Sequence, residues 1–372
     1  MSTSFVARVR AEADERPLRL FGLVALAIGV MAGLASLVLS LSGEAGVDER
    51  QVRVAGAGAV CVTAVAATIA VTRSRGPSLT RPSLHTVALV LGLGCWAIGA
   101  GLWFVRLAVG DDAVSAARGG MADHVYLLSG VLLIVFVFSH PSLGTAQRRL
   151  RAAIDATIVA VSVSVLTWLL AGRELLELTD APLSTASAYL LPSTDVIVLF
   201  MLLGALSLTS ELPVRSNVAT LAAAGMASAL LGDMLGLIDR AHGSPPALVV
   251  LSTMLLVTSL VLIAGAAVVS RRHEFSAVAV ATRLRLRGVL AAAPVLTAII
   301  ATAAVLVDAA LTGRFDATAA LVLTVVICAV LVRQSLTLSD NRELAESLQR
   351  TIDELELQAT HDVLTGLPNR SG

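Results

Sequence analysis

The feature that most constrains the fold of this chain is a series of ten apolar stretches. Each stretch is about as long as a helix that crosses a bilayer. A helix needs about 20 apolar residues to span the hydrocarbon core. Its backbone groups must hydrogen-bond within the lipid, which a helix achieves within its own segment. The chain is 56% hydrophobic and 15% charged, whereas soluble domains are about 25% charged. We therefore predict an all-α, polytopic membrane helical bundle of about ten spans over residues 18–338, after a cytoplasmic N-terminal segment over residues 1–17. The predicted spans are residues 18–41, 52–72, 84–109, 121–139, 152–171, 188–209, 218–238, 247–270, 289–311 and 317–338.

The arginines between these stretches predict the orientation of the bundle. Cytoplasmic loops of membrane proteins are enriched in Lys and Arg. With the N-terminus in the cytoplasm, most loop arginines lie inside, and many acids, such as Glu44, Asp48 and Glu49, lie outside. An even number of spans then places both termini in the cytoplasm. The inner arginines are Arg8, Arg10, Arg16, Arg19, Arg73, Arg75, Arg81, Arg148, Arg149, Arg151, Arg215, Arg271, Arg272, Arg283, Arg285 and Arg287, and the outer ones are Arg50, Arg53, Arg118, Arg173, Arg240 and Arg314.

The tenth apolar stretch continues into a polar segment without a helix breaker. Residues 333–358 contain neither Gly nor Pro and are mostly good helix formers. Glu346 and Arg350 have the i, i+4 spacing of a helical ion pair. We predict a signalling helix over residues 339–359, whose apolar stripe either pairs with a second copy in a coiled coil or lies against the bundle or the membrane. The stripe consists of Leu344, Leu348, Ile352, Leu355 and Ala359.

The nine residues from Asp362 to Arg370 follow this helix and read Asp-Val-Leu-Thr-Gly-Leu-Pro-Asn-Arg. The string resembles the opening of a GGDEF domain, the catalytic module of diguanylate cyclases, in which Asp-x-Leu-Thr-Gly-Leu-x-Asn-Arg follows a helix. In that family the Asp and the final Arg close a wide turn, so the resemblance implies a structural joint in which Asp362 pairs with Arg370. The matched positions are Asp362, Leu364, Thr365, Gly366, Leu367, Asn369 and Arg370.

The resemblance implies the membrane sensory and anchoring region of a bacterial diguanylate cyclase in the cytoplasmic (inner) membrane, with or without a phosphodiesterase domain. The nucleotide- and metal-binding residues of the family, including Gly-Gly-[Asp/Glu]-Glu-Phe, come later in such domains. Residues 360–372 are therefore expected to be the start of a truncated GGDEF domain with no catalytic residue. We expect no cofactor in this chain, because Mg²⁺ and GTP belong to the absent catalytic domain. The family also implies a homodimer formed through the signalling helix.

Several ionisable residues lie inside the apolar stretches, where they are costly and face the bundle interior or a cavity. Two interpretations remain open. In the first, these residues pair with one another, reach the interface or cap helix ends. In the second, Arg106 opposes Asp195 and Asp233 in a pocket that is open to the outside and takes a small polar or cationic ligand. The candidate residues are Arg106, Asp123, His124, Asp195 and Asp233, with Asp308 at similar depth and Asp155 toward the inside.

Two other functions remain open. A multi-span transporter or permease would suit ten spans with intramembrane acids, and a non-functional truncated cyclase gene product would suit the C-terminal string. The formal net charge of zero gives no basis for nucleic-acid binding. The spacing of the His and Cys residues does not favour a metal site. The lipid bilayer is the partner that the composition predicts.

Overall fold

The computed structural model describes residues 49–74, 83–109, 120–139, 146–174, 182–208, 213–242, 245–269, 280–314 and 317–360. These residues form nine α-helices and one π-helical turn. Three of the helices begin with a proline, which suits the first helical position because the N–H there has no partner within the helix. The elements are α2 (Glu49–Ser74), α3 (Leu84–Val109), α5 (Met121–Ser139), α6 (Ala146–Thr167), the π-helical turn η2 (Trp168–Gly172), α8 (Pro182–Leu208), α9 (Pro213–His242), α10 (Pro246–Val269), α11 (Val280–Thr312) and α12 (Ala317–Thr360).

Eight of these helices are long and apolar enough to cross a membrane. The chain is therefore a multi-pass membrane protein, as the sequence predicts. The predicted span 188–209 falls in α8, whose described apolar part is the shorter segment Leu190–Gly204. The predicted span 18–41 lies outside the described residues.

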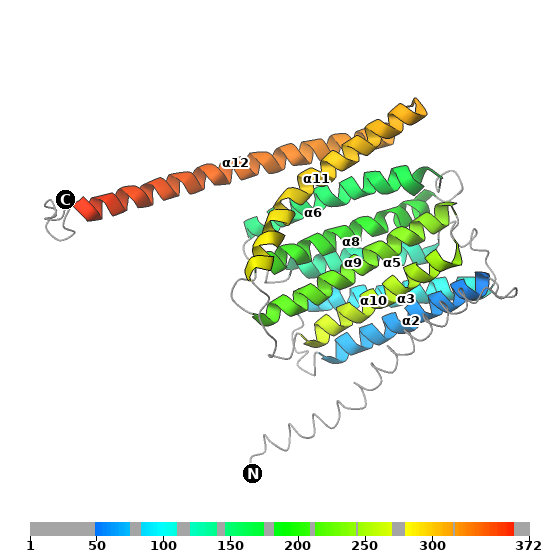
Figure 1. The fold of residues 1–372 in the computed structure, drawn as a ribbon. Helices are drawn as coiled ribbons and strands as arrows, with labels where there is room; N and C mark the ends of the chain where they lie inside the picture. The colour runs from blue at the N-terminus through cyan, green and yellow to red at the C-terminus, as the bar shows by residue number, and fades with distance from the viewer. Residues whose placement is uncertain are drawn as a thin grey trace, which may run out of the picture.

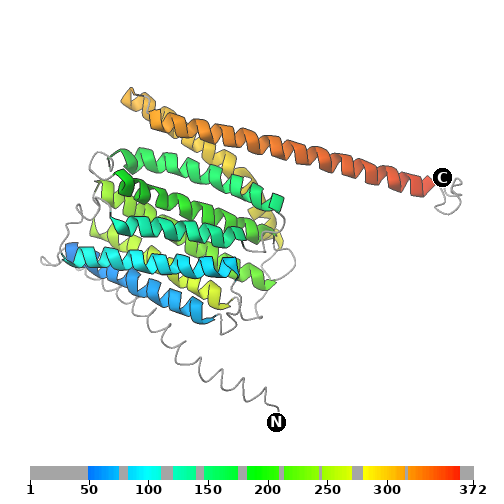
Figure 2. The same ribbon diagram turned by 180° about the vertical axis from the view of Figure 1, so that it is seen from behind.

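The helices lie side by side and alternate in direction (Figures 1 and 2). We call the end of the bundle from which α12 departs the arm end, and the opposite end the distal end. The N-termini of α6 and α11 lie at the arm end, whereas α2, α5 and α12 begin at the distal end (Figure 1). The largest buried apolar cluster joins α2, α3, α5, α6, α8, α9 and α10, through residues such as Ala64, Leu93, Leu133, Ala156, Met201, Met226 and Leu260.

Glycines allow close approach at several helix interfaces. A Cβ added to Gly225 or Gly232 of α9 would lie 3.1 or 3.2 Å from a backbone carbonyl oxygen of α10. The Ser252 hydroxyl donates a 2.8 Å hydrogen bond to the carbonyl of Gly232. At Gly130 of α5, an added Cβ would overlap Thr194 of α8, whose Cβ would be 2.8 Å away. Small residues let membrane helices pack this closely.

The α11–α12 hairpin lies at one edge of the bundle (Figures 1 and 2). Its turn ends α11 at Gly313, which has a positive φ of 66° and donates its N–H to the carbonyl of Ala309, as glycines after a helix commonly do. The hairpin packs on α6 through two small clusters, which contain Val305 with Leu323 and Ala298 with Val326. Its other faces expose large apolar side chains, including Leu296, Ile299, Ile300, Leu321, Val325 and Leu331.

Helix α12 is 44 residues long and runs unbroken from the distal end to Thr360. The described side chains from residue 334 onward are exposed, and we call residues 334–360 the arm. The arm includes the predicted stripe, of which Leu344, Leu348, Ile352 and Leu355 are exposed. The predicted pair is confirmed, with Arg350 Nη2 3.5 Å from Glu346 Oε2. The predicted joint, from Asp362 to Arg370, lies outside the described residues.

Candidate functional site: a buried acidic cluster and the root of the arm

Three aspartates, of which Asp123 and Asp195 are buried and Asp233 is partly buried, come together between α5, α8 and α9, and we call them the acidic cluster. Asp123 lies in the first turn of α5 and has 1% of its surface exposed, and Asp195 in α8 has 7% exposed. The carboxyl groups of Asp195 and Asp233, from α8 and α9, are close enough to interact with each other. The close approach of α5 and α8 at Gly130 and Thr194 brings the helices that carry these acids together.

One arginine pairs with the acidic cluster. Arg240, near the end of α9, donates a 3.0 Å hydrogen bond from Nη1 to Asp123 Oδ1. Its guanidinium carbon also lies 4.8 Å from the centroid of the Trp103 ring, which is within the range of a cation–π contact. Tyr126 of α5 lies near Asp233, Asp123 and Arg240, and its ring packs on Gly99 of α3.

The acidic cluster retains hydrogen-bonding capacity in the interior. Asp123 Oδ2, Asp195 Oδ2 and Trp103 Nε1 are buried and have no hydrogen-bond partner among the described residues. Buried polar atoms normally have partners, and each exception needs an explanation. This arrangement can therefore accept a hydrogen bond from a polar or cationic group. Within the described ranges, no group of three or more His, Cys, Asp and Glu side chains is arranged to hold a metal ion.

The structure places each of the five candidate residues. Asp123, Asp195 and Asp233 are in the acidic cluster. Arg106 and His124 lie beside Gly120, just before α5: the Arg106 guanidinium covers the Gly120 Cα, and the His124 ring is 3.1 Å from the Gly120 carbonyl. His124 is exposed.

Other ion pairs tie the distal end together. Arg53 of α2 makes a bidentate pair with Asp239 of α9, in which Nη2 is 3.0 Å from Oδ1. Arg173, directly after η2, pairs in the same way with Asp308 of α11, at 2.6 and 3.2 Å. Asp308, which the sequence places at the depth of the candidate site, thus belongs to a separate pair.

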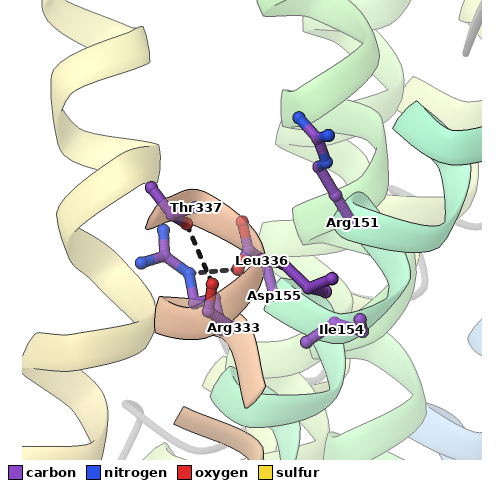
Figure 3. Close-up of a pocket in the computed structure, with 6 residues that line it drawn as sticks. All are labelled: Arg151, Ile154, Asp155, Arg333, Leu336 and Thr337. Atoms are coloured by element: carbon purple, nitrogen blue, oxygen red, sulfur yellow. Dashed lines mark hydrogen bonds and ion pairs between the residues drawn. The ribbon is translucent and has the colours of Figure 1, made fainter. Parts of the chain in front are cut away.

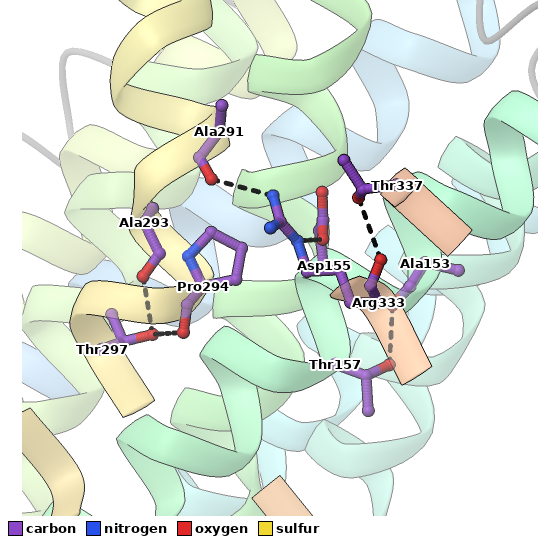
Figure 4. A network of polar contacts seen from close by, with 9 residues as sticks. All are labelled: Ala153, Asp155, Thr157, Ala291, Ala293, Pro294, Thr297, Arg333 and Thr337. Carbon is purple, nitrogen blue, oxygen red and sulfur yellow. Dashed lines mark hydrogen bonds and ion pairs between the residues drawn. The ribbon is translucent and has the colours of Figure 1, made fainter. Parts of the chain in front are cut away.

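A second polar site lies where α12 leaves the bundle. Arg333 Nε donates to Asp155 Oδ1 of α6, and Arg333 Nη2 donates a 2.8 Å hydrogen bond to the carbonyl of Ala291 in α11 (Figure 4). Ala291 lies in the turn before Pro294, which has no N–H to donate within α11. One arginine thus connects α12 to both neighbouring helices. A small hollow beside it, which we call the arm root, is lined by Arg151, Ile154, Asp155, Arg333, Leu336 and Thr337 (Figure 3).

The sequence pattern did not identify Arg240, Trp103 or Arg333 as site residues. The predicted apolar stretch 218–238 ends before Arg240, although α9 continues to His242. One pattern could have revealed Arg240: a polar residue that lies just beyond an apolar stretch and is followed by further helix formers. Arg333 lies inside the predicted stretch 317–338, near its polar end, where an arginine in an apolar stretch could have marked it.

Comparison of the chain with models of known protein families, with curated proteins and with solved structures finds no match. The fold and the polar sites therefore define a class, a multi-pass α-helical membrane protein with a long helical arm, without assigning the chain to a family.

Proposed function

We propose that this chain is the membrane sensory and anchoring region of a diguanylate cyclase, with ten spans, both termini in the cytoplasm and residues 339–359 as its signalling helix. The observation that carries the proposal is the continuity of α12. It runs without interruption from the buried residues Leu323 and Val326 to Thr360, two residues before the string that resembles the start of a GGDEF domain. The proposed role is signal transmission, and no residue of this chain is assigned to catalysis.

The exposed stripe on the arm supports a homodimer as the transmitting form. Leu344, Leu348, Ile352 and Leu355 follow one another at intervals of four or three residues on a helix whose described neighbours are also exposed. Burying apolar surface of this kind is favourable, and a second copy of the arm would cover the stripe from Leu344 to Leu355 along about 17 Å of helix, at 1.5 Å per residue. The two arms would then set the relative orientation of two catalytic domains.

The proposed mechanism is a shift between two packing arrangements of the bundle. A ligand or membrane state that favours one arrangement changes its population. The acidic cluster, two of whose carboxylate oxygens have no hydrogen-bond partner in the described part of the chain, is the proposed location for a polar or cationic stimulus. The α11–α12 hairpin would transmit the change, because its small apolar contacts with α6 limit the cost of moving it.

Insertions in the arm test this proposal. The whole chain would be joined after Gly372 to an active GGDEF catalytic domain, and alanines would be inserted between Arg342 and Glu343. Each residue rotates an α-helix by about 100°, so two residues rotate the following segment by about 200° and four by only about 40° relative to the starting phase. We expect two inserted residues to change cyclic di-GMP production at least about fivefold and four to restore it largely. The proposal would be contradicted if cyclic di-GMP production did not change with the insertions, or if it changed steadily with the number of inserted residues.

The buried acids also favour a second candidate function, a transporter for a polar or cationic solute. Intramembrane acids commonly mark substrate or ion pathways. Against this candidate, α8 passes through Pro192 as one helix, whereas transport sites are typically formed by interrupted helices. Uptake of labelled amines and amino acids into vesicles that contain the whole chain would distinguish the two functions, because the signalling region is expected to transport neither.

A further inference from the structure

The arm root combines basic and apolar side chains at one small hollow. Arg151, Ile154 and Asp155 come from α6, and Arg333, Leu336 and Thr337 come from α12 (Figure 3). The hollow has a volume of about 50 Å³, which leaves room for several polar atoms, since one water occupies at least about 10–15 Å³ measured in this way. The lining residues carry two guanidinium groups and one carboxylate, so the hollow has an excess of positive charge.

The contacts of Arg333 leave part of its guanidinium group available. Nε donates to Asp155 and Nη2 to the Ala291 carbonyl, whereas Nη1 has no hydrogen-bond partner among the described residues. The Thr337 hydroxyl donates to the carbonyl of Arg333 one turn earlier (Figure 4). Guanidinium groups bind phosphate oxygens well, because their N–H donors match the geometry of the anion.

The surroundings of the hollow favour a lipid over a free anion. Leu150 beside Arg151, and Leu331 and Val332 beside Arg333, expose apolar side chains that would contact acyl chains. The N-terminal parts of α6 and α11 lie at the same end of the bundle (Figure 1), and their sequences contain Arg148, Arg149, Arg283, Arg285 and Arg287. Basic pockets between membrane helices on the cytoplasmic side are typical binding sites for anionic lipid head groups.

We propose that the arm root binds the phosphate group of an anionic phospholipid between Arg151 and Arg333, with the acyl chains against the exposed apolar faces of α6 and α12. The regulatory consequence rests on the proposed signalling function. In that setting, the lipid phosphate competes with Asp155 and the Ala291 carbonyl for Arg333. Lipid composition then sets how firmly α12 is held to α6 and α11 at the point where it leaves the membrane.

Lipid retention by the whole chain tests this proposal. The protein would be reconstituted in phosphatidylcholine vesicles with increasing fractions of phosphatidylglycerol, and bound phosphatidylglycerol would be counted by native mass spectrometry after gentle extraction. Loss of one charged hydrogen bond costs about 1.5–3 kcal/mol, so we expect R151Q to weaken phosphatidylglycerol binding about tenfold or more. The matched control is R314Q, which removes an exposed arginine in the turn between α11 and α12, at the distal end, and should change binding less than about twofold.

Two further measurements keep the test decisive. R151K preserves the charge without the planar fork and should bind with intermediate affinity, which separates a binding defect from misfolding of R151Q. Inorganic phosphate added to phosphatidylcholine vesicles distinguishes the source of the anion, and we expect millimolar phosphate not to displace phosphatidylglycerol. Equal binding by R151Q and R314Q would overturn the site, and displacement by inorganic phosphate would overturn its assignment to lipid. Neither measurement uses a catalytic domain, so the result is independent of the insertion experiment.

Discussion

At the residue scale, several ionisable side chains inside this bundle are paired with specific partners. Asp123 is almost fully buried and its only described ionic partner is Arg240. Arg240 in turn contacts the Trp103 ring. Removing one member of such a pair leaves the other charge buried without compensation, which costs far more than the pair itself contributes.

We therefore expect D123A to lower the free energy of unfolding by about 3 kcal/mol. The measurement is unfolding of the purified chain in mixed micelles with increasing denaturing detergent. The matched control is E346A, which removes the acid of an exposed ion pair on the arm and should change stability by no more than about 0.5 kcal/mol. If D123A and E346A lowered the free energy of unfolding by similar amounts, the pairing of Arg240 with Asp123 would not contribute to stability.

The sequence identified the acids at this scale but not their partners. Asp123, Asp195 and Asp233 stand out because each interrupts an apolar stretch. Arg240 does not, because it follows the apolar part of α9 and resembles a loop residue. Its pairing with Asp123 joins residues 117 positions apart, and the pairing of Arg333 with Asp155 joins residues 178 positions apart. Such contacts depend on which helices are neighbours, which a pattern along one helix does not reveal.

At the scale of single elements, helix boundaries extend beyond the apolar stretches wherever polar residues find partners inside the bundle. Asp239 and Arg240 pair with α2 and α5, so α9 continues as a helix to His242. The predicted helices themselves are correct for the described part of the chain, because apolar composition and length largely determine them in a bilayer. Interfaces between helices depend instead on single small residues.

Gly130 provides a test of these interfaces. We expect G130A to destabilise the bundle by about 1–3 kcal/mol, because the added methyl group overlaps Thr194 and forces α5 away from α8. The same unfolding measurement applies, with G94A as the control, since a Cβ at Gly94 of α3 meets nothing within 4 Å. The double variant G130A/T194A should recover part of the loss. If G130A and G94A are equally stable, the close contact between α5 and α8 is wrong.

At the scale of the whole molecule, the distribution of charge separates the two ends of the bundle. Ion pairs from Arg53, Arg173 and Arg240 connect helices at the distal end, whereas the arginine-rich starts of α6 and α11 and the arm lie at the other end. The positive-inside rule then predicts that the arm end faces the cytoplasm. Because the helices pack side by side, we also expect all helix termini at the arm end to lie on the same side of the membrane.

Cysteine labelling measures this orientation. The native residues Cys61, Cys95 and Cys328 would be replaced by alanine, and single cysteines introduced as S347C on the arm and R314C at the distal end. In intact spheroplasts, we expect a membrane-impermeant thiol reagent to label R314C and to leave S347C unlabelled until the cells are lysed. Labelling of S347C in intact cells would place the arm outside and contradict the proposed function.

The polar attachment of α12 to α6 and α11 at Arg333 has a mechanical consequence. From Arg333 to Thr360 the helix extends about 40 Å, and from Arg333 back to Ala317 only about 24 Å, at 1.5 Å per residue. If the helix pivots at Arg333 as a stiff lever, a displacement of about 4 Å at its short end becomes about 7 Å at its tip. A lever of these proportions would amplify small motions at the distal end by geometry alone.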